Sequence, residues 1–201
     1  MLLKKVDAAD LVLDARELSS RLSVRGRVDY NTDPRYMRLI SAASCAYSAQ
    51  RLPICRENGE IFIGDIRIDG DAFAAVADGS SECFVMVCTL GMGVDRLIAK
   101  EQHLSVSDAF FIDAVADAMI EALCDAAERD FTDGLNTSPR FSPGYADLPL
   151  EVGKSIVGLL GADRRLGITF SESGLMIPRK SVSAIVCIKD RIGDAKDEKH
   201  T

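Results

Sequence analysis

The chain has 201 residues, 47% of them apolar, and it carries a formal net charge of −7 and no tryptophan. This length fits one large domain, and the apolar share can fill a sizeable core. The negative charge and the absence of a basic run argue against binding to nucleic acid or to an anionic membrane surface. No apolar run is long enough to span a membrane, and Lys4 and Lys5 interrupt the start before a signal-peptide core could form.

Six cysteines are present, none of them in a C-x-x-C pair, and four lie inside apolar segments. This pattern predicts reduced, buried thiols in a cytoplasmic protein rather than a disulfide framework. Two histidines are too few for a histidine-rich metal site, and we predict none. One of them, His200, lies in the segment 191–201, which is charged and predicted to be disordered.

The first part of the chain favours helices. A short helix is predicted over 10–22. A second begins where Asp33 can act as N-cap and Pro34 occupies the first turn. Apolar residues at helical spacing carry this second helix toward Gln50, and Pro53 is expected to stop it.

Two extended segments follow. The segment 61–68 alternates between apolar and polar residues, and Gly64 marks a bulge or turn within it. The segment 83–88 is a continuous apolar run, which is typical of a strand buried on both faces.

A turn with Gly91 and Gly93 connects this apolar strand to a short helix predicted around 94–100. Such a turn can hold a phosphate at the start of a helix. The dinucleotide-binding fingerprint needs a third glycine and an acidic residue after the next strand, and the sequence has neither. The pattern therefore favours an ordinary strand-to-helix turn.

The longest helix is predicted over 105–131, where Ser105 and Asp108 have the spacing of a capping box. Six apolar residues at helical spacing form its buried face: Ile112, Val115, Ala116, Met119, Leu123 and Ala127.

The rest of the chain returns to extended structure. A loop rich in Pro, Gly and Ser covers 133–150, and a helix is predicted over 150–160. Two short strands, 167–170 and 174–177, precede a final strand over 181–188. Because helices and strands do not alternate strictly, the order predicts an α+β fold with a twisted, mainly antiparallel sheet flanked by helices.

An acidic stripe runs along the predicted long helix, opposite its apolar face. Its five members are Asp113, Asp117, Glu121, Asp125 and Glu128. Small residues flank the stripe and would let a partner approach closely, namely Ala114, Ala118 and Ala122. These like charges repel, and no lysine lies between them in the sequence. The stripe is either a solvated face or a surface for a cationic ligand or a basic partner.

The segment 140–145 combines groups that suit an amino-acid-like ligand. Pro143 and Gly144 set a tight turn, which fixes Tyr145 relative to Arg140. Arginine can donate to a carboxylate, and tyrosine supplies a ring face and a hydroxyl. The alternative is an ordinary surface loop with an exposed arginine.

The segment 140–145 resembles the R-x-x-x-G-Y motif of the activation domain of cobalamin-dependent methionine synthase. The resemblance extends to 113–131, which is similar to the long helix before that motif. It also includes 171–173 and 181–183, which are similar to the closing hairpin. It covers 83–188 well and the earlier residues loosely. It implies a single domain over 1–190, with a loosely matching part at 1–80 and the tail 191–201.

The resemblance implies a role in repairing oxidised cobalamin. In that family, an electron from a flavodoxin-like donor and a methyl group from S-adenosylmethionine convert inactive cob(II)alamin to methylcobalamin. The activation domain binds S-adenosylmethionine, whereas the cobalamin is carried by another part of the enzyme. Matching by position implies that Glu121, Arg140, Ser142, Gly144 and Tyr145 contact S-adenosylmethionine, with Glu121 facing the positive charge of the ligand. No catalytic residue is implied.

The chain resembles the stand-alone members of this family. These would act in trans on a methionine synthase that lacks its own activation domain, as one component of a methyltransferase activity. It departs from the fused enzymes after the tyrosine, where Ala146 and Asp147 replace a Pro-containing segment. It also has Gly134 where they carry an acidic residue. These departures keep a second hypothesis open, a non-catalytic docking protein for a corrinoid protein that has lost S-adenosylmethionine binding.

Overall fold

The structure, a computed structural model, describes residues 1–22 and 30–189, and the charged segment 191–201 lies outside this part of the chain. The helices in chain order are η1 (Ala8–Asp10, a 3-10 turn), α1 (Ala15–Arg21), α2 (Pro34–Ala42), α3 (Asp71–Ala77), α4 (Met92–Leu104), α5 (Val106–Thr132), α6 (Val152–Leu159) and α7 (Ala162–Arg165). The strands are β1 (Leu2–Lys5), β2 (Ala46–Glu57), β3 (Glu60–Ile63), β4 (Ile66–Ile68), β5 (Ser80–Thr89), β6 (Thr169–Phe170), β7 (Met176–Ile177) and β8 (Ser181–Lys189).

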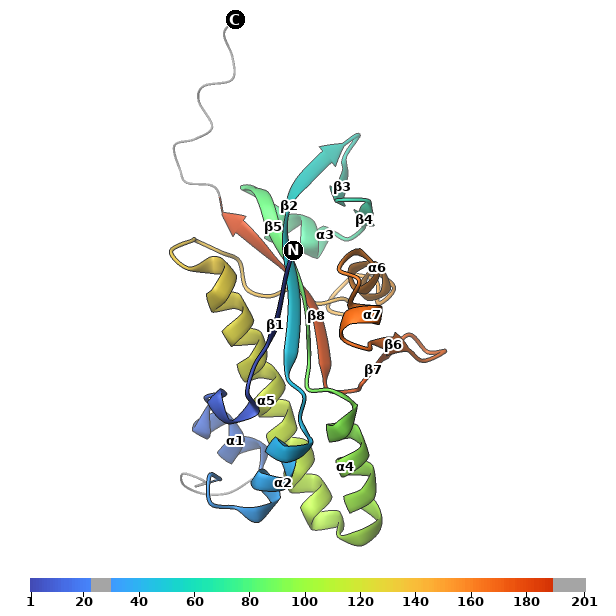
Figure 1. Cartoon of the computed structure of the whole chain (residues 1–201). Helices are drawn as coiled ribbons and strands as arrows, with labels where there is room; N and C mark the ends of the chain where they lie inside the picture. Colours follow the sequence, from blue (N-terminus) through green and yellow to red (C-terminus); the bar gives the residue numbers. More distant parts are fainter. Residues whose placement is uncertain (23–29, 190–201) are drawn as a thin grey trace, which may run out of the picture.

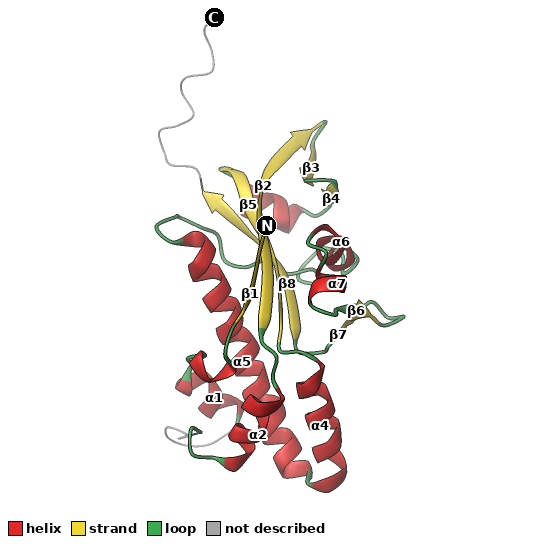
Figure 2. Ribbon diagram, viewed as in Figure 1, coloured by secondary structure: helices red, strands yellow, loops and turns green. Residues whose placement is uncertain are grey.

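The strands form one antiparallel sheet in the order β4-β3-β2-β5-β8, and β1 also pairs with β2. A separate small hairpin joins β6 to β7. Figures 1 and 2 show the helices gathered on both sides of this curled sheet. The structure therefore confirms the predicted α+β fold with a mainly antiparallel sheet.

Each face of the sheet packs against its own apolar core. On one face, Met86 and Cys88 of β5 pack with α5, α4 and the N-terminal helices. On the other face, Val85 and Val87 pack with α3, α6 and the β3–β4 hairpin. Successive side chains of a strand point to opposite faces, so burial on both faces requires an uninterrupted apolar run. This confirms the interpretation of 83–88.

The helix predicted to run from Pro34 toward Gln50 is shorter in the structure. Asp33 caps it as predicted, and its carboxylate accepts a hydrogen bond from the Arg35 backbone N–H at 2.8 Å. The helix ends at Ala42, and β2 begins at Ala46, so the prediction was wrong beyond that point. Pairing of β2 with β1 and β5 overrides the moderate helix propensity of this segment.

Pro53 lies inside β2, not after a helix. At this position the pairing of β2 changes from β5, which ends at the pair Pro53–Glu82, to β3, which begins at Ile54–Ile63. Proline has no backbone N–H, so it is tolerated where a strand exchanges partners. Proline thus has a role here that the sequence pattern alone did not indicate.

The long helix agrees with its prediction. α5 is continuous, and the hydroxyl of Ser105 caps it by accepting from the Asp108 backbone N–H at 3.3 Å. All six residues of the predicted apolar face are buried. α5 packs along β2, β5 and β8 on one face of the sheet, as Figure 1 shows, and its residue Asp113 lies beside the start of β8.

Other elements differ in detail. The predicted helix over 10–22 is divided into η1 and α1, and the helix predicted around 94–100 extends to Leu104. The two strands predicted over 167–170 and 174–177 are each reduced to two residues. The sequence pattern gave no indication of β1, α3 or α7. These short or edge elements carry too few residues for a clear periodicity.

Gly91 and Gly93 have a packing role. Gly91 is the N-cap of α4 with a φ of 82°. A Cβ at Gly93 would lie 2.0 Å from the carbonyl oxygen of Ala42, the last residue of α2. The glycine therefore lets α4 start directly against the end of α2, in agreement with the prediction of a strand-to-helix turn.

Five of the six cysteines are buried free thiols, and Cys55 is exposed. In the described part of the chain, no helix is both long and apolar enough to cross a bilayer.

Candidate functional site

The segment 140–145 is fixed to the edge of the sheet. The backbone N–H of Phe141 donates to the carbonyl of Ile185 at 2.9 Å, and the Ile185 N–H donates to the carbonyl of Phe141 at 2.9 Å. The next residues turn sharply, because the Tyr145 N–H donates to the Ser142 carbonyl at 3.1 Å. Gly144 has a φ of 86°, as the predicted turn requires. The loop is thus held rigidly beside β8.

Arg140 and Tyr145, the first and last residues of this motif, have side chains that point in different directions. Arg140 reaches α5, whereas the Phe141 ring packs in the opposite core against Phe73, with centroids 5.7 Å apart. The Tyr145 ring packs edge-on against the Phe141 ring, with centroids 5.6 Å apart, and the Tyr145 side chain is exposed. Side chains alternate along an extended segment, so Arg140 and Tyr145 are not brought together.

Arg140 binds three members of the acidic stripe. Its guanidinium donates to Glu121 at 2.8 Å, to Asp125 at 2.8 Å and to Glu128 at 2.7 Å. Its side chain is only 22% exposed, so it is not the solvated arginine of an ordinary surface loop. The structure therefore brings together two of the predicted site residues, Arg140 and Glu121.

Burial and charge oppose each other within this cluster. Burial raises the pKa of Glu128 above its ordinary value, while the charge and hydrogen bond of Arg140 act to lower it. Burial acts to lower the pKa of Arg140, but hydrogen bonding to Asp125 and nearby negative charge hold it above its usual range. The positive charge of Arg140 and the negative charge of Glu128 therefore each favour the charged form of the other, against the effect of burial.

Lys180 neutralises the other half of the acidic stripe. This residue precedes β8 and is almost completely buried, and its ammonium lies 2.9 Å from the Asp113 carboxylate and 2.5 Å from that of Asp117. Arg21 also reaches Asp117, at 3.4 Å. The sequence has no lysine within the stripe and left a solvated face, or a surface for a cationic ligand or a basic partner, as the alternatives. The compensating cations come from distant segments that tertiary folding brings to α5.

The small residues beside the stripe do not leave room for a partner. Ala114, Ala118 and Ala122 are all buried. Ala118 and Ala122 belong to the same core as Ala184 and Val186 of β8. The close approach that these alanines permit is therefore used by the sheet itself.

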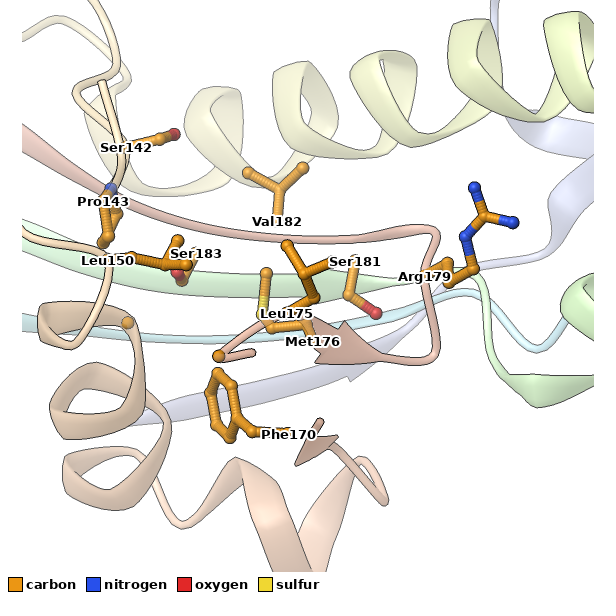
Figure 3. A pocket seen from close by; sticks show the side chains of 12 residues that line it. Ser142, Pro143, Leu150, Phe170, Leu175, Met176, Arg179, Ser181, Val182 and Ser183 are labelled. Atoms are coloured by element: carbon orange, nitrogen blue, oxygen red, sulfur yellow. The ribbon is translucent and has the colours of Figure 1, made fainter. Parts of the chain in front are cut away.

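A pocket of about 390 Å³ opens next to the motif. Twelve residues line it: Ser142, Pro143, Leu150, Gly153, Phe170, Gly174, Leu175, Met176, Arg179, Ser181, Val182 and Ser183. Figure 3 shows Ser142 and Pro143 at one end and Arg179 at the other, with Phe170, Leu175 and Met176 between them. This size falls in the range of small-molecule sites.

The predicted site residues have different relations to this pocket. Ser142 lines it. Gly144 supports it indirectly, since a Cβ there would lie 3.2 Å from the Leu150 side chain. Glu121, Arg140 and Tyr145 do not belong to its lining.

Sequence reasoning missed Arg179 and Lys180 as site residues. The signal was available, because two adjacent cations stand out immediately before a strand in an acidic chain. The sequence pattern does not show that Arg179 and Lys180 lie in different environments. Lys180 is buried against α5, whereas Arg179 is exposed at the pocket.

No family model matches this chain, and no curated protein matches it. Among solved structures, the chain is similar to the MetH reactivation domain bound to AdoHcy. The TM-score is 0.71 at 17% sequence identity, and the match covers 100% of this chain and 80% of the other. The chain therefore has the fold of the MetH reactivation domain.

Proposed function

We propose that this chain is a reactivation module that binds S-adenosylmethionine and serves a cobalamin-dependent methionine synthase in trans. The observation that carries the proposal is the pocket of about 390 Å³ beside the R-x-x-x-G-Y loop, in a fold whose solved example holds AdoHcy. The ligand classes agree, because AdoHcy is S-adenosylmethionine without its methyl group. The synthase served would be one that lacks its own activation domain.

The pocket has the chemistry that an adenosyl ligand needs. Phe170, Leu175 and Met176 provide apolar and aromatic surface for a flat base. Ser181 and Ser183 contribute hydroxyls, and Ser181 also bonds to the Thr89 hydroxyl at 2.8 Å. A few placed polar groups on an apolar wall are typical of small-molecule sites.

The protein's own contribution would be binding and orientation. Cobalamin, held by the partner synthase, would carry the methyl-transfer chemistry, and a flavodoxin-like donor would supply the electron. Glu121 and its neighbours on α5 present negative charge beside the motif, which favours the positively charged sulfur of the methyl donor.

Glu121→Gln should distinguish this charge effect from simple shape. The variant keeps the size of the side chain and removes its charge. It should weaken S-adenosylmethionine by roughly three- to tenfold, because Glu121 is partly exposed and solvent screens its charge. AdoHcy, which has a neutral sulfur, should bind with nearly unchanged affinity. Calorimetric titration of both ligands measures the difference.

The control for this titration is Glu57→Gln on β2, an exposed acidic residue away from the pocket, which should leave both affinities unchanged. Equal weakening of the two ligands by Glu121→Gln would contradict the charge argument while keeping the ligand. Failure of the wild-type chain to bind either ligand at millimolar concentration would remove the proposal itself.

Action in trans is tested by reactivation of an oxidised synthase. A methionine synthase without its activation domain, in the cob(II)alamin state, is mixed with a flavodoxin-like reductant, S-adenosylmethionine and this chain. The absorption of methylcobalamin should return, and omission of any one component should prevent it. The isolated chain should hold no cobalamin. Stoichiometric cobalamin in the purified chain, or no recovery, would contradict the proposal.

One observation favours the alternative, a docking protein for a corrinoid protein that no longer binds S-adenosylmethionine. Arg140 is already bound to three carboxylates, and Tyr145 lies outside the pocket lining. In that case the chain would associate with the oxidised synthase, but neither ligand would bind in the titration above.

A further inference from the structure

A second, smaller pocket of about 240 Å³ lies between α4, α5 and the residues that lead into β8. It is distinct from the larger pocket beside the R-x-x-x-G-Y loop, although Arg179 lines both. Ile98 and Ala99 of α4 give it an apolar wall, and Asp95 and Arg179 bring charges of opposite sign. Its volume is below the range of drug-sized sites, so it suits a small ligand.

Asp95 has a buried carboxylate oxygen without a partner. The residue lies in the first turn of α4, and its Oδ2 accepts from the backbone N–H of Arg179 at 2.7 Å. This bond fixes the carboxylate in the pocket wall. Among the described residues, nothing donates to the other oxygen, Oδ1. A buried acceptor without a donor destabilises the fold, so Oδ1 is a position where a bound molecule would donate.

Arg179 supplies the complementary charge. Its side chain is exposed, and its guanidinium forms no ion pair with any carboxylate of residues 1–22 and 30–189. Figure 3 shows this guanidinium directed away from the apolar side chains of the larger pocket. The Arg179 backbone is bonded to Asp95, so the side chain starts beside that carboxylate. An exposed arginine has many accessible rotamers, so the spacing of the two charges can adjust to a ligand.

The charge of Lys180, which also lines the smaller pocket, is satisfied within the protein. Its ammonium lies 2.9 Å from the Asp113 carboxylate and 2.5 Å from that of Asp117. Asp95 and Arg179 therefore remain as the groups that can bind a charged ligand. A ligand with a single charge would leave one of these two groups unpaired, whereas a ligand with both charges would pair with both.

We propose that the smaller pocket binds a small amino acid as a zwitterion. The ligand ammonium donates to Oδ1 of Asp95, the ligand carboxylate accepts from Arg179, and an aliphatic side chain packs on Ile98 and Ala99. A guanidinium can hold a carboxylate through two parallel hydrogen bonds, which fixes orientation as well as affinity. This site is separate from the proposed S-adenosylmethionine site, because Asp95, Ile98 and Ala99 do not line the larger pocket.

The test uses L-norvaline and two analogues that each lack one of its charges. Valerate has the same carbon chain without the ammonium, and butylamine has the ammonium without the carboxylate. The wild-type chain, titrated with each compound and followed by NMR of its backbone amides, should bind norvaline about tenfold or more tighter than either analogue. The reason is that each analogue loses one charge-assisted hydrogen-bonding group.

Three variants locate the binding. Asp95→Asn keeps an acceptor for the Arg179 N–H and removes the charge, so it should weaken norvaline by about tenfold and change valerate by less than about twofold. Arg179→Gln should weaken norvaline by about tenfold and change butylamine by less than about twofold. Ala99→Leu narrows the pocket without altering its charge and should also weaken norvaline.

The matched controls are Asp163→Asn and Arg164→Gln, two exposed residues of α7 that line neither pocket. Both should leave the affinities for all three compounds unchanged. Circular dichroism verifies that each variant is folded. Undiminished binding of valerate to Asp95→Asn and of butylamine to Arg179→Gln shows directly that the pocket is intact.

Several results would overturn the inference. If the wild-type chain does not bind norvaline at roughly 10 mM, the pocket holds only solvent. If valerate or butylamine binds as tightly as norvaline, the site does not recognise a zwitterion. If Asp95→Asn and Ala99→Leu leave norvaline binding unchanged, the amino acid binds elsewhere. None of these results affects the proposed function, which the titrations with S-adenosylmethionine and AdoHcy test independently.

Discussion

Replacing Gly93 with alanine should lower the free energy of unfolding by about 3 kcal/mol, at the upper end of what overpacking costs. The new Cβ would lie 2.0 Å from the carbonyl oxygen of Ala42. That oxygen belongs to the backbone at the end of α2, so the clash cannot be relieved by turning a side chain. α4 would have to move away from α2, and Val94 and Ile98, which are buried in the same core, would move with it. Urea unfolding followed by circular dichroism measures the change.

Gly158→Ala is the matched control for this substitution. Gly158 lies in α6, is exposed, and a Cβ there would meet nothing within 4 Å. Alanine should therefore stabilise the protein by about 0.5–1 kcal/mol, because glycine loses more backbone freedom on folding. A Gly93→Ala protein as stable as wild type would show that α2 and α4 do not need this close approach.

Replacing Arg140 with methionine should destabilise the protein by about 1–3 kcal/mol at neutral pH. Methionine retains an apolar stem but leaves three carboxylates without their shared cation. Most of the loss should come from Glu128, whose side chain is 25% exposed. Glu121 and Asp125 are 42% and 58% exposed, so solvent screens their contributions.

The loss of unfolding free energy caused by Arg140→Met should depend on pH. Burial raises the pKa of Glu128 in the folded protein, and removal of Arg140 raises it further, since the arginine acts to lower it. A group with a raised folded pKa favours the folded state fully below its unfolded pKa, and this contribution is lost as pH rises through the folded pKa. The difference in unfolding free energy between wild type and variant should therefore narrow as the pH falls from 7 toward 5.

Two further variants test this explanation. Glu128→Gln introduced into the Arg140→Met protein should recover part of the lost stability, because it removes the unpaired buried charge. Arg51→Met should cost less than about 0.5 kcal/mol, since Arg51 and its partner Glu82 form an exposed pair on the sheet. If the loss of unfolding free energy in Arg140→Met does not change with pH, Arg140 stabilises the protein by packing and not by its charge.

The sequence by itself determined the elements whose signals are local. Asp33 and Ser105 cap their helices as predicted, because an N-cap needs only a side chain and the next backbone N–H groups. The apolar face of α5 and the doubly buried β5 follow from periodicity over long segments. These elements, with the predicted closing strand β8, were enough to indicate the α+β class.

Only the tertiary structure decided that residues 46–53 form a strand, since their pairing partners in β1 and β5 lie tens of residues away in sequence. It also decided the state of the acidic stripe. Glu121 looked unpaired in sequence, yet Arg140 reaches it from the loop before β8. Lys180, the residue immediately before β8, reaches Asp113 and Asp117. A charge is available to a ligand only if no neighbour in space already binds it, and sequence spacing does not record neighbours in space. For that reason the motif at Arg140 could be found in the sequence, whereas the three carboxylates that bind Arg140 became evident only in the fold.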